Sequence, residues 1–252
     1  MSGHSKWSTI KRKKGAADAK RGQLFTRLAR EISIAARQGG GDPETNVRLR
    51  LAIEKARSNN MPKENIERAI QRGTGEGKDG STTLEEVFYE GYAPHGIALI
   101  IECVTDNRNR AVAEIRHILN RFGGSMGETG SVSWQFNRVA YFSFPDNGID
   151  QDRIFELAVE AGADDVTFEE GIVEIIGPTD NFKQISDSLE AARIKPEEAE
   201  LRLVPTNEIE LSPAEAVQVL RVIEALEELD DVQNVYSNLL ISDEALAELE
   251  TA

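Results

Sequence analysis

Basic residues gather around one tryptophan near the N-terminus, and they are the strongest chemical signal in the sequence. Residues 1–21 contain seven Lys and Arg but a single acid, Asp18, and a single aromatic residue, Trp7. The seven are Lys6, Lys11, Arg12, Lys13, Lys14, Lys20 and Arg21. Lys and Arg neutralise phosphates and an indole stacks on an unpaired base, so we expect this segment to bind nucleic acid. A solubilising tail is the alternative, although so many basic residues are a poor choice for solubility alone.

Two pairs of arginines further along the chain are also candidates for contacts with anions. Arg48 and Arg50 lie in the same basic part of the chain, where a phosphate contact competes with a solvated helix face. Arg108 and Arg110 fall in the first turn of a predicted helix, where the helix dipole disfavours cations. We therefore expect either an outside anion at these two arginines or a local ion pair between Asp106 and Arg110.

No pattern of residues in the sequence indicates catalysis or a metal site. His4, His95 and His117 are far apart, and no Ser-x-x-Lys or Gly-x-Ser-x-Gly sequence accompanies them. The one cysteine, Cys103, sits in an apolar stretch and is predicted to be a core residue. We therefore predict a protein that is not an enzyme and that uses no metal, cofactor or small-molecule substrate.

The net charge of −15 is divided unevenly along the chain. Residues 1–78 hold 18 Lys and Arg against 8 Asp and Glu, a net +10, whereas residues 79–252 hold 11 against 36, a net −25. The basic end predicts a polyanionic partner, or else docking on the acidic end of the same chain. The longest aliphatic run, Ile97–Ile101, is far shorter than the roughly 20 residues of a membrane helix. With no apolar segment at the start and a lone cysteine, we expect a cytoplasmic protein without membrane contact.

The elements that position these residues begin with a small helical domain. We expect residues 1–21 to form an extended or weakly ordered arm. Apolar spacing then predicts three helices, over residues 24–36, 47–56 and 62–72. The second and third of these could form a DNA-binding helix-turn-helix, but Glu64 and Glu67 would repel phosphates. A plain three-helix bundle explains the pattern equally well.

Strands and helices alternate through the rest of the chain. Between residues 80 and 138 the pattern predicts strands over 87–92 and 97–104, a helix capped by Asp106, and a strand over 131–136. Residues 139–205 follow the β-α-β-β-α-β order of a ferredoxin-like domain. Beyond them the pattern predicts a helix from the capping box at Ser212 and a strand over 232–240.

These elements predict an α+β protein in which a basic N-terminal three-helix domain precedes two ferredoxin-like α/β domains, one inserted into the other. The middle region lacks a helix and a strand for a balanced sheet, and the C-terminal region supplies one of each. The predicted domains are residues 1–79, a discontinuous domain of 80–138 with 206–252, and an inserted domain of 139–205.

Motifs along nearly the whole chain resemble those of the YebC/PmpR family. They are Gly3-His4-Ser5-Lys6-Trp7, Asp18-Ala19-Lys20-Arg21-Gly22, Gly39-Gly40-Gly41-Asp42-Pro43, Asn60-Met61-Pro62, Tyr89-Glu90-Gly91-Tyr92, Asp106-Asn107-Arg108-Asn109-Arg110, Gly130-Ser131-Val132 and Leu226-Glu227-Glu228-Leu229-Asp230-Asp231-Val232-Gln233. Two departures are small. Ala111 stands where the family commonly has Thr or Ser, and Trp134-Gln135 replaces a more usual Tyr-Leu or Tyr-Met.

The resemblance implies a three-domain cytoplasmic protein of a kind described as a probable DNA-binding transcriptional regulator. Related mitochondrial proteins are translational activators, and some bacterial members are linked to ribosomes that stall on proline-rich stretches. One alternative is therefore a translation factor that binds ribosomal RNA, transfer RNA or the ribosome. The acidic two-thirds of the chain would repel a long duplex, which favours this alternative. A second alternative is a protein-interaction module whose acidic domains bind a basic partner.

Overall fold

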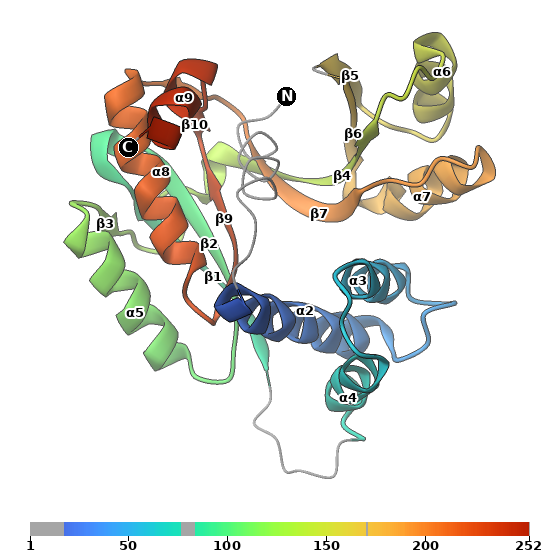
Figure 1. Cartoon of the computed structure of the whole chain (residues 1–252), viewed down its shortest axis with the longest axis horizontal. Coiled ribbons are helices and arrows are strands. Elements are labelled where there is room, and N and C mark those ends of the chain that lie inside the picture. The colour runs from blue at the N-terminus through green and yellow to red at the C-terminus, as the bar shows by residue number, and fades with distance from the viewer. Residues whose placement is uncertain (1–17, 77–83, 170, 252) are drawn as a thin grey trace. The chain divides into compact units, whose positions relative to one another are not determined.

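The structure is a computed structural model that describes residues 18–76, 84–169 and 171–251. The chain divides into two compact units, one spanning Phe136–Val204 and the other made of the residues before and after that stretch. Figure 1 shows helices and strands in both units. The predicted α+β class is therefore confirmed.

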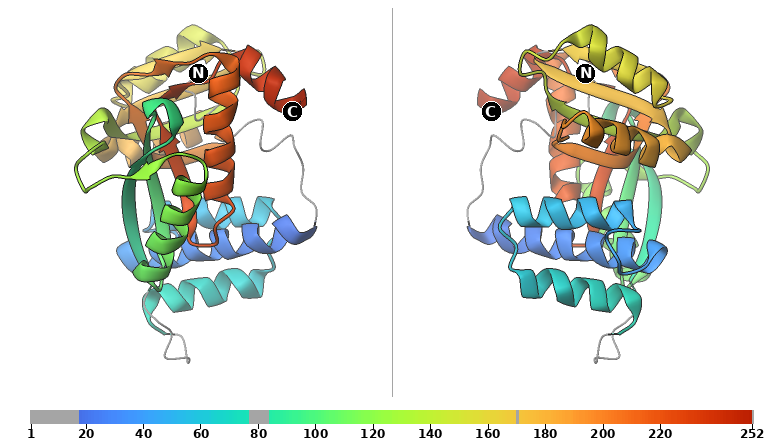
Figure 2. Two further views of the ribbon diagram at one scale, coloured as in Figure 1. Left: turned by 90° about the vertical axis from the view of Figure 1, so that its left-hand side faces the viewer. Right: turned by 90° about the vertical axis from the view of Figure 1, so that its right-hand side faces the viewer.

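Three helices form the N-terminal part of the larger unit, and Figure 2 shows them side by side. They are α2 (Asp18–Gly39), α3 (Val47–Ser58) and α4 (Lys63–Thr74). Residues buried every three or four positions make one apolar cluster, which includes Leu28, Ile32, Leu49, Ile53 and Ile66. The helices α2 and α4 approach so closely that a Cβ at Gly73 would lie 2.3 Å from the backbone oxygen of Ser33. The predicted N-terminal three-helix region is confirmed.

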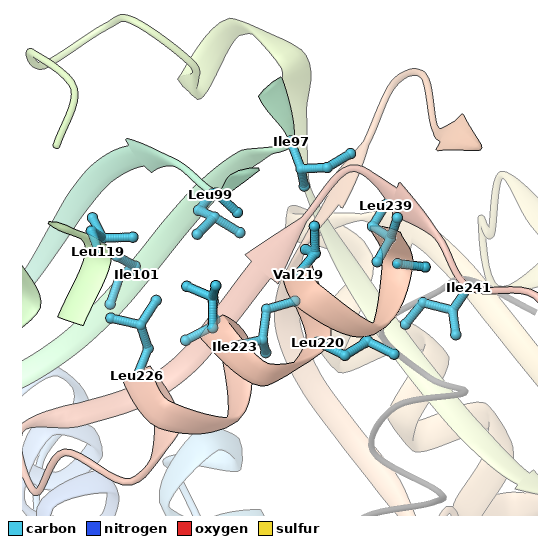
Figure 3. Packing of buried hydrophobic residues seen from close by; sticks show 14 of the residues in the cluster. Ile97, Leu99, Ile101, Leu119, Val219, Leu220, Ile223, Leu226, Leu239 and Ile241 are labelled. Atoms are coloured by element: carbon cyan, nitrogen blue, oxygen red, sulfur yellow. The ribbon is translucent and has the colours of Figure 1, made fainter. Parts of the chain in front are cut away.

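A four-stranded sheet in the order β3-β1-β2-β9 follows in the same unit. Its strands are β1 (Glu85–Tyr92), β2 (Ala98–Thr105), β3 (Ser125–Met126) and β9 (Val232–Ser237), all antiparallel to their neighbours. The helices α5 (Arg108–Arg121) and α8 (Pro213–Glu227) supply the apolar side chains that cover one face. Figure 3 shows Ile223 and Leu226 of α8 beside Leu99 and Ile101 of β2. Burying each such side chain stabilises the fold by about 1.5–3 kcal/mol.

The helical region is attached to this sheet mainly through α2. Ile34 of α2 is buried in a small cluster with Leu84 and Val104. The Gln23 side chain of α2 donates to the backbone oxygen of Glu228, and Arg27 donates to that of Gln233. The three helices and the sheet therefore share apolar and polar contacts within one unit.

The smaller unit is a four-stranded sheet in the order β5-β6-β4-β7 with two helices. Its elements are β4 (Phe136–Pro145), α6 (Gln151–Glu160), β5 (Asp165–Glu169), β6 (Ile172–Pro178), α7 (Phe182–Ala191) and β7 (Glu198–Pro205). Buried residues of both helices, such as Ile154 and Ile185, share one apolar cluster with Phe142 and Ile175 of the sheet. The β-α-β-β-α-β sequence and this strand order are those of a ferredoxin-like fold.

Two predictions about strands are wrong. The predicted strand over residues 131–136 is replaced by a short 3₁₀ turn, Ser133–Gln135, and β4 begins only at Phe136. The backbone N–H groups of Val132 and Ser133 bond to the carboxylate of Glu90 and are not available to a strand partner.

The predicted strand over residues 232–240 is divided in two. β9 ends at Ser237, and β10 (Leu239–Leu240) pairs with β8 (Ile209–Glu210) in a separate sheet. Asn238 lies between them, and its side chain accepts a hydrogen bond from the Ala98 N–H at 2.9 Å. A final helix, α9 (Asp243–Thr251), was not predicted.

The N-cap of α5 was also predicted wrongly. The cap is Asn107, whose side-chain oxygen accepts a hydrogen bond from the backbone N–H of Arg110 at 3.0 Å. Asp106 instead forms an ion pair with the Arg110 side chain. Because Asn and Asp are similarly good caps, the sequence pattern alone did not separate the two.

Candidate nucleic-acid interface

The residues of the predicted N-terminal interface are only partly within the described structure. Six of them, Lys6, Trp7, Lys11, Arg12, Lys13 and Lys14, lie outside the described residues. Lys20 and Arg21 belong to the first turn of α2, which begins at Asp18. An extended arm is therefore wrong for residues 18–21, where Ala, Lys and Arg favour a helix and an acid suits its first turn.

Arg48 connects the helical region to the sheet. Its guanidinium donates to Glu86 Oε1 on β1 at 2.8 Å and to the side-chain oxygen of Gln38 at 2.5 Å. Burial lowers the pKa of Arg48, but the hydrogen bond and charge of Glu86 raise it, and the net direction is upward. Arg50, two residues later, is half-buried on α3. An outside phosphate at Arg48 would have to compete with the Glu86 carboxylate.

Arg108 and Arg110 are held differently, although they are only two residues apart. Arg108 contacts Glu85 of β1 at 2.6 Å, and its side chain is 65% exposed. Arg110 reaches Asp106 at 2.9 Å and also both carboxylate oxygens of Asp231 at 2.9 Å. The hydrogen bond to Asp231, followed by that to Asp106, raises the pKa of Arg110. The predicted Asp106–Arg110 ion pair is present, and the second carboxylate was not foreseen.

Asp231 joins two helices to the sheet. Its side chain is 2% exposed and contacts Arg30 of α2 at 2.9 Å in addition to Arg110 of α5. The hydroxyl of Thr105 donates to the same carboxylate at 3.0 Å. A buried carboxylate needs such charged and hydrogen-bonded partners. Sequence reasoning missed this cluster because its members are separated by as many as 201 positions along the chain.

Two other arginines on the helical region stay available for an anion. Arg57 lies in the last turn of α3 and Arg72 in the last turn of α4, and both are exposed. Within residues 18–76, 84–169 and 171–251, no ion pair or side-chain hydrogen bond engages either guanidinium. Neither residue belongs to the apolar positions that predicted these two helices, and that was a signal of exposure already present in the sequence.

The one thiol of the chain lies in the core, whereas His95 and His117 are exposed. Cys103 is fully buried, and burial, followed by the charges of Asp231 and Glu102, raises the pKa of its thiol. His95 is within hydrogen-bond distance of the Gln218 side chain, at 3.1 Å. Among the described residues no group of three or more His, Cys, Asp or Glu is placed to hold a metal ion. Within that same part of the chain, every helix is too short or too polar to cross a membrane.

Two family models match the chain. The model described as the N-terminal domain of TACO1/YebC proteins matches residues 5–76, and that of their second and third domain matches residues 84–239. A relative from Acidithiobacillus ferrooxidans named "Probable transcriptional regulatory protein" is 55% identical over 250 residues, 99% of each chain. One from Geotalea uraniireducens with the same name is 52% identical over 246 residues, 98% of each chain.

A solved structure has the same fold. The crystal structure of a conserved hypothetical protein from Aquifex aeolicus superimposes with a TM-score of 0.81 at 41% sequence identity. The match covers 90% of this chain and 93% of that one. Both family models, the full-length relatives and this common fold lead to one conclusion: the chain belongs to the TACO1/YebC family.

Proposed function

We propose that this protein is a non-enzymatic regulator of gene expression that binds nucleic acid through its N-terminal third. Its relatives are named probable transcriptional regulatory proteins, and a DNA-binding regulator is accordingly the first form of the proposal. The observation that carries the proposal is the surplus of positive charge in residues 1–78, a net +10 in a chain whose overall charge is −15.

The contacts of the described arginines support this proposal. Arg30, Arg48 and Arg110 are bound to carboxylates of the chain itself, so they add little to the attraction of an outside anion. Arg57 and Arg72 are exposed on α3 and α4, two helices that lie in the basic N-terminal third of the chain. Exposed cations bind polyanions by releasing condensed counterions, and that gain depends steeply on salt.

The experiment is a salt titration of binding to a fluorescent duplex DNA and to a structured RNA. Neutralising Lys11, Arg12, Lys13 and Lys14 to Gln should weaken binding and flatten the slope of log K against log salt concentration. The expected loss of slope is about 0.7–0.9 for each phosphate contact removed. The melting temperature should hardly change.

A matched control removes the same charge elsewhere. Arg116, Arg138, Arg153 and Arg221 are exposed and lie outside the basic third, and their replacement by Gln should leave the slope as it is. If the two quadruple variants lower the slope equally, binding depends on the net charge of the whole protein, and a dedicated N-terminal interface is refuted. Replacing Arg57 and Arg72 by Gln tests the described part of the interface by the same measurement.

The second candidate function is a translation factor that engages RNA or the ribosome. The net −25 of residues 79–252 favours it, because a long duplex lying across that part of the chain would be repelled. Crosslinking in cells followed by sequencing of the attached nucleic acid separates the two candidates. Promoter DNA supports the transcriptional form, and ribosomal or transfer RNA supports the translational form. Purification with and without nuclease tests the remaining alternative, a module that binds a basic protein.

A further inference from the structure

Trp134 is the most exposed large apolar side chain in the described part of the chain. The residue is 73% exposed, compared with 51% for Phe155 and 42% for Phe88. An indole buries a large apolar area when it is covered, so a folded chain gives up considerable stability by leaving one in water. An indole kept in this position is a candidate for contact with a partner.

The segment before Trp134 is held firmly in place. The carboxylate of Glu90, on β1, accepts hydrogen bonds from the backbone N–H groups of Gly130 at 2.7 Å, Val132 at 2.6 Å and Ser133 at 3.0 Å. Val132 is fully buried. Three hydrogen bonds to one ionised, mostly buried carboxylate fix the backbone up to the residue immediately before the tryptophan.

The residue after Trp134 is fixed as well. The backbone oxygen of Gln135 accepts two hydrogen bonds from Thr206, one from its backbone N–H at 2.8 Å and one from its side-chain hydroxyl at 3.0 Å. The side-chain oxygen of Gln135 accepts a third, from Asn238, at 3.1 Å. Trp134 therefore projects from a short turn whose two flanking residues are both anchored, so its exposure is not that of a loose loop.

The indole itself is oriented by its one polar atom. Its Nε1–H donates to the backbone oxygen of Ser131 at 3.0 Å. With that donor satisfied inside the protein, the ring offers a partner only its apolar faces and edges. A group that binds there must gain its affinity from stacking, and a planar aromatic ring suits that requirement.

The residues next to Trp134 in the sequence favour contact through a base and not through a phosphate. Glu128, Thr129 and Ser133 are polar and exposed, and the charge of Glu128 repels a phosphate. A base can stack on one aromatic face without an apolar rim, and every base has a suitable face.

We propose that Trp134 is a stacking site for an unpaired nucleobase, so that the protein binds single-stranded or looped nucleic acid in preference to an uninterrupted duplex. This inference rests on the proposed nucleic-acid-binding function and narrows its substrate class. It also places a second contact outside the basic N-terminal third, one that recognises bases and not phosphates.

The chain offers a direct optical test, because it has two tryptophans, Trp7 and Trp134. In the Trp7→Phe variant, Trp134 is the sole source of tryptophan fluorescence. Titrating this variant with a single strand of about 12 nucleotides, a common site size for such binding, should quench the emission. The blunt duplex of the same sequence should cause little quenching at equal occupancy, which is measured independently by anisotropy of a labelled strand.

Substitutions supply the second readout. Trp134→Leu should weaken single-strand binding by roughly five- to a hundredfold, which corresponds to the loss of one stacked base. Trp134→Phe should restore part of that loss. The slope of log K against log salt should stay as in the unaltered protein, because no phosphate contact is removed. Phe155→Leu, at an exposed aromatic position on α6, is the matched control and should leave affinity unchanged.

The outcomes separate this inference from the proposed function. Salt-dependent binding without quenching of Trp134, and with Trp134→Leu unchanged in affinity, would overturn the stacking site and leave the proposed function standing. Equal quenching by the duplex would overturn the preference for unpaired bases. An unaltered protein that binds neither strand nor duplex at low salt would refute both proposals.

Discussion

The buried carboxylate of Asp231 forms an ion pair of 2.9 Å with Arg30, 201 positions earlier in the sequence. The same carboxylate holds Arg110, so one acid ties both α2 and α5 to the start of β9. A buried ion pair adds little net stability over apolar packing, but it specifies which groups must meet. We expect it to fix the place of α2 on the sheet.

Replacing Asp231 by Asn should lower the free energy of unfolding by about 3–5 kcal/mol, because Arg30 and Arg110 would both lose the buried carboxylate that they contact. Urea unfolding measures the change. Asp230→Asn is the matched control: the backbone oxygen of that residue contacts Arg30, whereas its side chain is not needed for the contact. Similar losses from both substitutions would mean that general charge, and not the Asp231 cluster, is responsible.

Replacing Arg110 by Gln should affect stability much more than replacing Arg108 by Gln. Arg110→Gln should destabilise the fold, because Asp231 would lose a partner while it remains buried. Arg108→Gln breaks an exposed pair worth about 0.2–1 kcal/mol and should leave stability nearly unchanged. Thermal unfolding and nucleic-acid affinity are measured together. Reduced affinity for Arg108→Gln alone would place an outside anion at Arg108, and undiminished affinity for both variants would remove both from the interface.

Stability should depend on pH through Glu90. Burial raises the pKa of Glu90, but hydrogen bonds from Gly130, Val132 and Ser133 lower it, and the net direction is downward. A carboxyl whose pKa is lower in the folded state stabilises the fold above its unfolded pKa, which is about 4.3 for Glu. That contribution is lost as the pH falls through the folded-state pKa.

Glu90→Gln tests this at several pH values. At pH 7 it should cost about 1.5–3 kcal/mol, the range for hydrogen bonds to a charged group. The difference from the unaltered protein should shrink as the pH falls below 4. Glu128→Gln, at an exposed position of the same loop, is the control and should show no such trend. A difference that stays constant with pH would show that the ionised carboxylate is not what holds the loop.

We propose that residues 139–205 form an inserted domain that folds alone, and a fragment tests this. Because β4 begins at Phe136, the fragment should span residues 136–205, and it should unfold cooperatively. A fragment of residues 80–138 lacks α8 and β9, so it should expose Leu99 and Ile101 and aggregate. Calorimetry and dye binding measure the two outcomes. Stable folding of residues 80–138 alone would contradict the proposed boundaries.

Local patterns in the sequence were enough to predict most helices and strands. The three N-terminal helices, the β1–β2 hairpin and the alternating elements of Phe136–Val204 follow from apolar spacing and turn residues close to each element. The misassigned segments have distant partners. Residues 131–135 do not form a strand because Glu90, some forty positions earlier, accepts hydrogen bonds from the N–H groups of Val132 and Ser133. Asn238 interrupts β9 because its side chain bonds to the Ala98 N–H.

For the candidate site, too, some features follow from the local sequence and others depend on contacts between distant residues. The sequence by itself determined that the N-terminal third is strongly basic and that Trp7 lies among its charges, because composition and spacing need no partner to be seen. Only the tertiary structure decided that Arg48 and Arg110 contact Glu86 and Asp231, and that Trp134 is left in solvent. Whether an arginine is available to a phosphate depends on carboxylates that the fold brings within about 3 Å, from any distance along the chain.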